Sequence, residues 1–396
     1  MKIQTIPAVL LFILTSFCCI AQEDAPAVPP KLKGWVFECA GFAGRQIKIY
    51  PDYPKNGING YFEANVGYKT FGTKPWHADW RYPQYGVAFL YGYLGNPAVL
   101  GNNYSLLPYL LLESKDERKI AADVRVGVGL AYFDTRYNRI SNPENIIIGS
   151  RFTGIANLSV NLRKRLSSHW ALYGGVSFIH CSNGHSHLPN VGMNTVALNA
   201  GIRYYPAGKP APLKKESTAA AKDRRVMMNL RFGYGTHEFG SATKPLGGAH
   251  YPVYALSLFA SIRVGKISNV HAGIFVNYYT GFYDYIRNQN FYDSGQIRKS
   301  VTASIFVGHE FLIGRFGLVW QSGVNIYNPF QRDYYKLLLG SGTSAMLKTY
   351  WCNKIGGQVY LFRTSEVRRF NMWFGIYIKT NLLTADFAES AVGIRF

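Results

Sequence analysis

The chain has 396 residues and a formal net charge of +21, because 43 Lys and Arg stand against 22 Asp and Glu. Aromatic residues make up 15% and charged residues only 16%, which excludes an intrinsically disordered chain. Beyond the N-terminus no apolar run approaches the roughly 20 residues that a membrane-spanning helix needs. The composition, with 40 Gly, 29 Tyr and 25 Phe, favours an all-β chain.

Residues 1–21 are predicted to be a secretory signal peptide. Lys2 supplies the positive charge at its start, residues 8–14 form a short apolar core, and small residues precede Gln22. A retained membrane anchor is disfavoured because the apolar stretch is too short. Three cysteines remain in the mature chain, which is too few and too widely spaced for a disulfide scaffold.

From about residue 34 onward, stretches of period-two alternation are separated by turn residues. In residues 120–132 one face is aliphatic, whereas the other carries Asp123, Arg125 and two glycines. Apolar side chains outside and polar side chains inside are what a membrane barrel strand requires. We therefore predict an all-β fold, a transmembrane antiparallel β-barrel of the bacterial outer membrane with about 12–16 strands. The candidate strands lie near 34–42, 58–71, 84–94, 104–112, 120–133, 147–164, 168–180, 192–205, 225–238, 252–265, 269–279, 297–312, 315–327, 349–363, 369–380 and 385–396.

Short and long connections alternate along the chain, as in outer-membrane barrels with short periplasmic turns and long outer loops. This alternation of short and long connections predicts a short N-terminal periplasmic segment, 22–33. It also predicts that the strand that ends near His180 runs toward the outer surface of the membrane. A polar periplasmic connection, 206–224, separates barrel strands in 34–205 from further strands in 225–396. The chain closes with Phe396 after alternating apolar residues, a terminal signal typical of barrels that engage the barrel-assembly machinery. Whether one large barrel or two form, and whether the protein oligomerises, stays open.

The segment 178–194 differs from ordinary barrel wall. Alternation continues the apolar face of the incoming strand into His180 and Ser182, and the apolar face of the outgoing strand begins at Asn194. Both faces are expected to point at lipid. Polar side chains on such a surface cost free energy unless they have partners or a function.

These residue types suit nucleophilic catalysis on an ester. The Ser182 hydroxyl would be the nucleophile once a base accepts its proton, and His180, two residues away on the same strand face, would be that base. Asn194 on the paired strand can accept the second ring N–H of the imidazole and hold its orientation. Asn183 and Gly184 are the expected oxyanion donors.

The spacing His-x-Ser-Asn-Gly, with Asn 14 residues after the His, resembles outer-membrane phospholipase A, whose triad is His, Ser and Asn. With Pro189-Asn190-x-Gly192, the segment is more similar to the PagL-type lipid A 3-O-deacylases and related acyloxyacyl-hydrolase-like proteins. The likeness extends upstream through 132–135 and 142–145, over residues 34–205. It implies an eight-stranded barrel, which matches the first eight candidate strands, and removal of an ester-linked acyl chain from lipid A.

Two departures from these families affect the expected chemistry. The third triad position of the deacylases is Glu, whereas this chain has Asn194, which keeps an acceptor but loses the charge that stabilises imidazolium. We expect this change to affect rate rather than geometry. The phospholipases use calcium through a dimer, and His185 here replaces an Arg of their motif, so calcium is expected only under the phospholipase alternative. Otherwise no cofactor is expected.

Other interpretations of the polar residues are weaker. His180, His185 and His187 could form a metal cluster, but no acidic residue or suitably spaced Cys joins them, so no metal site is expected. Cys181 is expected to point into the barrel. His237-Glu238 and His309-Glu310 are adjacent pairs whose members face opposite sides of a strand, and we interpret them as wall or rim residues. No nucleic-acid motif accompanies the basic charge, which suits phosphate-rich lipopolysaccharide better.

We therefore predict an outer-membrane serine esterase that removes acyl chains from lipid A, a carboxylic ester hydrolase with its site toward the outer leaflet. Catalysis would rest on Ser182, His180 and Asn194. Two alternatives are a phospholipase A acting on glycerophospholipids and a non-catalytic barrel or channel.

Overall fold

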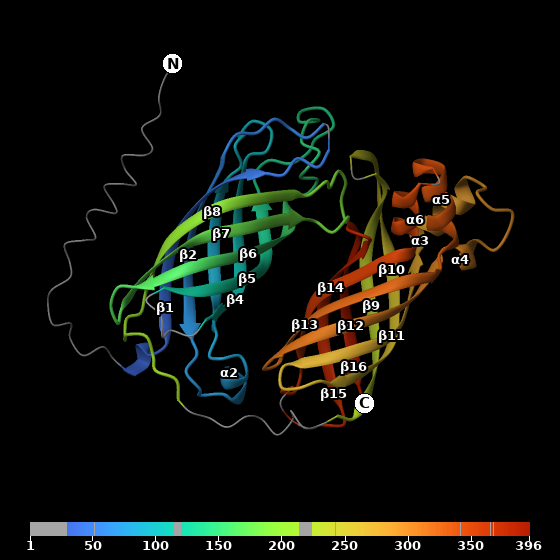
Figure 1. Ribbon diagram of the computed structural model, residues 1–396. Coiled ribbons are helices and arrows are strands. Elements are labelled where there is room, and N and C mark those ends of the chain that lie inside the picture. Colours follow the sequence, from blue (N-terminus) through green and yellow to red (C-terminus); the bar gives the residue numbers. More distant parts are fainter. Residues whose placement is uncertain are drawn as a thin grey trace, which may run out of the picture.

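The computed structural model describes residues 30–50, 52–114, 120–213, 224–241, 243–340, 342–364, 366 and 368–396. The predicted signal peptide lies outside these residues. The described residues form sixteen strands, which is the top of the predicted range, and they close into two separate eight-stranded antiparallel barrels (Figure 1). Strand β1 pairs with β8 to close the first barrel, and β16 pairs with β9 to close the second.

The first barrel is preceded by one short 3-10 turn, η2 (Pro30–Leu32). Its strands follow chain order, and a short helix, α2 (Pro75–Asp79), lies in the connection between the second and third strands. The strands are β1 (Trp35–Gln46), β2 (Asn59–Lys69), β3 (Gln84–Tyr93), β4 (Asn102–Glu113), β5 (Ile120–Phe133), β6 (Phe152–Arg165), β7 (Trp170–Ser182) and β8 (Met193–Tyr204).

The second barrel carries its helices in the connections of one end, which Figure 1 shows above the strands in orange and red. Its strands are β9 (Val226–Ser241), β10 (Lys244–Arg263), β11 (Ser268–Tyr279), β12 (Val301–Ile313), β13 (Phe316–Tyr327), β14 (Trp351–Tyr360), β15 (Asn371–Asn381) and β16 (Thr384–Arg395). The helices are α3 (Thr280–Asn288), α4 (Gln296–Lys299), α5 (Pro329–Leu339) and α6 (Thr343–Tyr350).

The outer surface of both barrels is apolar, as the alternation predicts. On β5 the outward side chains Val126, Val128 and Leu130 are exposed, whereas their neighbours Arg125 and Ala131 are buried inside. The second barrel repeats the pattern on β13, where Trp320 and Val324 face out and Gln321 and Asn325 face in. Large exposed apolar side chains over the walls are typical of strands that face lipid hydrocarbon.

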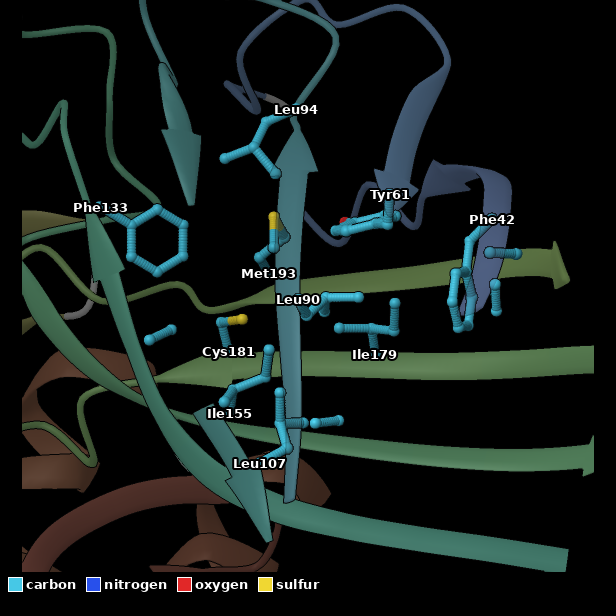
Figure 2. Close-up of a cluster of buried hydrophobic side chains, with 14 of the residues drawn as sticks. Phe42, Tyr61, Leu90, Leu94, Leu107, Phe133, Ile155, Ile179, Cys181 and Met193 are labelled. Carbon is cyan, nitrogen blue, oxygen red and sulfur yellow. The ribbon is translucent and has the colours of Figure 1, made fainter. Parts of the chain in front are cut away.

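The lumen of the first barrel is filled. Toward the end that holds α2, the Arg203 guanidinium contacts Glu38, Glu113 and Asp123 at 2.8, 3.0 and 3.3 Å, and Arg125 pairs with Glu63. Toward the opposite end the lumen is apolar, and Figure 2 shows this cluster of buried side chains, among them Cys181, Met193, Ile155 and Phe133. Among the described residues, paired charges and apolar side chains pack this interior, unlike the water-filled lumen of a porin.

The second lumen is filled in the same manner. Lys354 pairs with Glu389, Lys379 pairs with Asp386 at 2.6 Å, and all four side chains are buried. At the end that carries the helices, Phe282 of α3 and Phe330 of α5 pack on Phe239 and Tyr279 of the strands. The helical connections therefore cover one mouth of this barrel with aromatic side chains.

The two barrels touch at both ends. At one end Trp80 Nε1, just after α2, donates to the carbonyl of Leu312 at 2.8 Å. At the other end the connection between β7 and β8 lies against β9, where the Glu238 N–H donates to the carbonyl of His185 at 3.2 Å. Within the part of the chain that the structure describes, no helix is both long and apolar enough to cross a membrane.

Candidate active site

The candidate site lies at the rim where β7 ends and β8 begins. The ten residues between them, 183–192, are called the active-site loop below. On β7 the outward positions run Val176, Phe178, His180 and Ser182, and the first two are 50% and 40% exposed. His180 and Ser182 thus continue an apolar, outward-facing stripe, and both are themselves partly exposed. This placement agrees with the predicted lipid-facing position.

His180 and Asn194 form a direct pair. They lie opposite each other in the β7–β8 register, and Asn194 Oδ1 is 2.7 Å from His180 Nδ1. An amide oxygen can only accept, so His180 Nδ1 carries the proton and Nε2 is left as a base. The structure therefore brings together the predicted base and its predicted orienting group in the tautomer that general-base catalysis needs.

The Ser182 hydroxyl oxygen accepts two hydrogen bonds. The Gly184 N–H donates to it at 3.2 Å, and Asn190 Nδ2 donates at 3.0 Å. Because a hydroxyl has two lone pairs and one proton, both lone pairs are used and the O–H remains available to a base. Among the described residues no hydrogen bond joins Ser182 to the His180 ring, and such contacts often tighten only when substrate binds.

Asn183 has its donors engaged within the loop. Its N–H donates to Asn190 Oδ1 at 3.2 Å, and its side-chain Nδ2 donates to the carbonyl of His187 at 2.6 Å and to Ser150 Oγ at 3.2 Å. These contacts place Asn183 as a residue that holds the loop together. Of the predicted oxyanion donors, Gly184 therefore keeps its N–H beside the Ser182 oxygen, and Asn190 joins it there.

The segment upstream that carries the family likeness supports this loop. Asn142 and Asn145 both donate through Nδ2 to the carbonyl of Val99, at 2.9 and 2.8 Å. The carbonyl of Ile146 in turn accepts the N–H of Val191 in the active-site loop, at 3.3 Å. The outer connection between β5 and β6 thus braces the loop between β7 and β8.

Gly192 lies beside both predicted catalytic side chains. Its backbone has φ of +77°, a conformation that favours glycine, and a Cβ there would lie 3.5 Å from His180 Cε1 and 3.9 Å from Ser182 Cβ. The glycine therefore keeps open the space over the His180–Ser182 pair.

The three histidines that the sequence groups together have separate surroundings. His180 pairs with Asn194, His185 stacks on His237 of the second barrel at 5.1 Å between ring centroids, and His187 lies near His250. Burial, with the neighbouring His237 as a second cause, lowers the pKa of His185 to about 3, so this ring is neutral. Cys181 points into the lumen, as predicted, and is buried.

An open apolar groove runs beside Asn194 on the outer surface. It lies between β1 and β8 and is lined by Ile47, Ile58, Val196 and Leu198. The Ile47 N–H donates to the carbonyl of Asn194 at 2.7 Å, which ties the end of β1 to the triad position. A groove of this kind could hold one acyl chain next to the reactive pair.

Sequence reasoning placed His180, Ser182 and Asn194 together but gave Asn190 no role. Asn190 is eight residues beyond Ser182 and reaches it only because the loop folds back through the Asn183 contact. The Pro189-Asn190 pair that carries the family likeness was the available signal.

Two family models match the chain. The model described as lipid A 3-O-deacylase (PagL) matches residues 60–203, and the model described as acyloxyacyl hydrolase, C-terminal domain, matches residues 226–396. No curated protein matches.

Several solved structures are similar to parts of the chain. The outer membrane enzyme PagL is 16% identical with a TM-score of 0.29, over 41% of this chain and 97% of that chain. Neisserial surface protein A is 8% identical with a TM-score of 0.32, over 44% of this chain and 97% of that chain. OccK3 of Pseudomonas aeruginosa is 11% identical with a TM-score of 0.21, over 91% of this chain and 94% of that chain.

The first family model lies within the first barrel, and the second family model corresponds to the second barrel. Together the two models span most of the chain. The deacylase model includes the candidate site and its bracing loop, and the C-terminal model includes the whole second barrel. The first barrel therefore matches the lipid A 3-O-deacylase (PagL) family of the bacterial outer membrane, and the second barrel matches the acyloxyacyl hydrolase C-terminal domain.

Proposed function

We propose that this protein hydrolyses an ester-linked acyl chain of lipid A with Ser182 as nucleophile and His180 as general base. His180 Nε2 takes the Ser182 proton as the oxygen attacks the ester carbonyl carbon, and Asn194 holds the ring through Nδ1. The Gly184 N–H and Asn190 Nδ2, which donate to Ser182 Oγ in the free protein, turn to the substrate's former carbonyl oxygen as it becomes the oxyanion of the tetrahedral intermediate. The imidazolium then protonates the departing sugar oxygen, and water activated by His180 releases the fatty acid from Ser182.

The observation that carries this proposal is the His180–Asn194 hydrogen bond of 2.7 Å on a lipid-facing surface beside Ser182. A neutral acceptor on Nδ1, a free Nε2 and a serine whose O–H proton is left for a base supply the parts of an acyl-transfer site. The apolar groove beside Asn194 would receive the acyl chain, so that the ester bond lies at the membrane surface.

Charge at the rim supports a phosphate-bearing substrate. The outer connections of the first barrel carry exposed basic side chains around the site, namely Lys48, Lys55, Arg136, Arg139 and Arg151. Lipid A carries phosphate groups, which cationic side chains attract and orient.

The direct test is mass spectrometry of lipid A from cells that produce the wild-type chain or Ser182→Ala. We expect wild type to remove one acyl chain and Ser182→Ala to lower the rate at least ~1,000-fold, because the nucleophile is lost. Ser168→Ala, at the opposite end of the barrel, is the matched control and should keep full activity. Heat-modifiability on gels checks that every variant has folded into its barrels.

Unchanged lipid A with a folded wild-type protein would contradict the proposal. A phospholipid assay with and without calcium then separates a phospholipase from a passive barrel. Release of fatty acid from glycerophospholipid that depends on Ser182 would reassign the substrate but keep the residues. Equal activity of wild type and Ser182→Ala on lipid A would show that the proposed catalytic residues are wrong.

A further inference from the structure

The active-site loop is fastened to the second barrel by a compact polar junction. Leu188 N–H in the loop donates to Glu238 Oε2 at 2.7 Å, and His250 Nδ1 donates to the carbonyl of Ser186 at 2.5 Å. The Glu238 side chain is only 1% exposed although it lies on the outer face of β9. A buried carboxylate between two barrels needs partners that its own strand does not provide.

Three ligand atoms converge at this junction. Glu238 and His250 are direct cross-strand partners of β9 and β10, so their side chains share one face. His187 of the loop completes the group, with its Nδ1 3.2 Å from His250 Nε2 and 3.4 Å from Glu238 Oε2. All three ligand atoms lie within 4.8 Å of one another.

These separations match the coordination shell of a small divalent ion. Ligand bonds of about 2.0–2.1 Å at tetrahedral angles place neighbouring ligand atoms about 3.3 Å apart. The 3.2 and 3.4 Å distances in this group fall on either side of that value. The third pair, Glu238 and His250, lies within 4.8 Å, so a single ion could meet all three atoms after adjustment of these side chains.

The surroundings also orient the ligands for an ion. Because His250 Nδ1 donates to Ser186, its Nε2 lone pair points at the group. The backbone N–H of Leu188 donates to Glu238 Oε2, the oxygen that also faces His187, and so holds the carboxylate in place. A hydrogen bond to the far ring nitrogen, as His250 makes here, is the usual support of a histidine ligand in proteins.

We propose that His187, Glu238 and His250 bind one divalent transition-metal ion, of which Zn²⁺ is the best fit. Two imidazoles and one carboxylate are ligands that zinc accepts, and water would complete four-coordination. The ligands come from both barrels, so the ion ties the active-site loop to the second barrel. Sequence patterns did not predict this site, because its second and third ligands, Glu238 and His250, lie 51 and 63 residues beyond His187.

The ion would act on the reaction through the loop. The His187 carbonyl accepts Asn183 Nδ2, Asn183 N–H donates to Asn190 Oδ1, and Asn190 Nδ2 donates to Ser182. Fixing His187 therefore fixes the two donors beside the Ser182 oxygen. This consequence for hydrolysis rests on the proposed function, whereas the binding of the ion does not.

The test uses the full chain without a polyhistidine tag, purified in detergent and treated with a chelator. Co²⁺ is titrated as a spectroscopic probe in the absence of lipid A, and Zn²⁺ is then added to displace it. We expect one Co²⁺ per chain with a visible absorption of tetrahedral or five-coordinate type. His250→Ala and Glu238→Ala should weaken binding at least about 100-fold, because each removes one of three protein ligands.

His169→Ala is the matched control, since this histidine lies in the turn at the opposite end of the first barrel, and its titration should equal that of wild type. Binding of Co²⁺ that is unaffected by His250→Ala and Glu238→Ala would overturn the proposal, as would the absence of any absorption above a detergent blank. The three side chains would then form a hydrogen-bonded junction only. Deacylation of lipid A is measured separately, so failure of the catalytic proposal leaves the Co²⁺ result unchanged and distinguishable.

Discussion

His180 and Asn194 face each other across β7 and β8, and a contact of 2.7 Å joins His180 Nδ1 to Asn194 Oδ1. The barrel register sets this pairing, so no loop movement is needed to form it. An asparagine orients the ring without adding negative charge. In the proposed mechanism the imidazolium is therefore stabilised by position and by a dipole rather than by an ion pair.

Substitutions of Asn194 should distinguish the effect of orienting the His180 imidazole from the effect of placing a negative charge beside it. We expect Asn194→Ala to lower kcat about 10- to 100-fold, since the imidazole loses the partner that fixes its tautomer. Asn194→Glu keeps an acceptor and adds charge, and should equal or exceed the wild-type rate. Initial rates of fatty-acid release from lipid A micelles measure both. A wild-type rate in Asn194→Ala would remove this residue from the mechanism.

Substitutions of Asn190 and Asn183 should have different effects, the first on kcat and the second on the rigidity of the active-site loop. Asn190→Asp replaces the donor beside the Ser182 oxygen with a charged acceptor, so we expect kcat to fall about 100- to 1,000-fold. Asn183→Ala should instead loosen the loop, because its side chain makes two hydrogen bonds, to Ser150 Oγ and to the His187 carbonyl. Limited proteolysis reports that loosening. If Asn190→Asp retained full kcat with a folded barrel, the oxyanion role would be wrong.

Gly192 provides a test of the space over the reactive pair. Gly192→Ala adds a Cβ beside His180 Cε1 at a φ of +77°, and should cost about 1–2 kcal/mol of backbone strain as well as activity. Gly208→Ala is a matched control, since its φ is +70° and its Cβ would meet only Ser168 at the far end. Both variants carry strain, but only the first should lose lipid A hydrolysis. Equal activities would show that the space over the pair is unimportant.

The charged interior of the first barrel should be essential for its stability. Arg203→Met leaves Glu38, Glu113 and Asp123 without their shared cation, and we expect a loss of about 3–5 kcal/mol, as for other broken buried pairs. Denaturant titration followed by heat-modifiability on gels measures the change. Arg139→Met, at an exposed loop position, should leave the midpoint unchanged.

Period-two alternation was sufficient to locate the strands. All sixteen predicted strands are present, and β5 has the predicted limits, because one lipid-facing and one packed face impose alternation on every residue. The number of barrels was left open, since closure depends on which distant strands pair, β1 with β8 and β9 with β16. The helices α3 to α6 were predicted only as long connections, and α3 and α5 are stabilised by packing on Phe239 and Tyr279 of the strands, which no local pattern shows.

In the candidate site, too, the features that depend on local alternation were predicted and those that depend on long-range contacts were not. His180, Ser182 and Asn194 follow from local alternation and strand pairing, so the sequence was enough to bring them together. Asn190 and the His187–Glu238–His250 group were missed. They depend on a folded-back loop and on contact between two barrels, which no local periodicity records.

The filled lumens have a consequence for how rates must be measured. Because Arg203 and Lys354 are buried with their carboxylate partners, the described residues leave no path for substrate or fatty acid through either barrel. Encounters at the rim are therefore confined to two dimensions, within the leaflet that surrounds the protein. Turnover should follow the mole fraction of substrate in the membrane and fall upon dilution with inert lipid, even when the total substrate in the sample is constant.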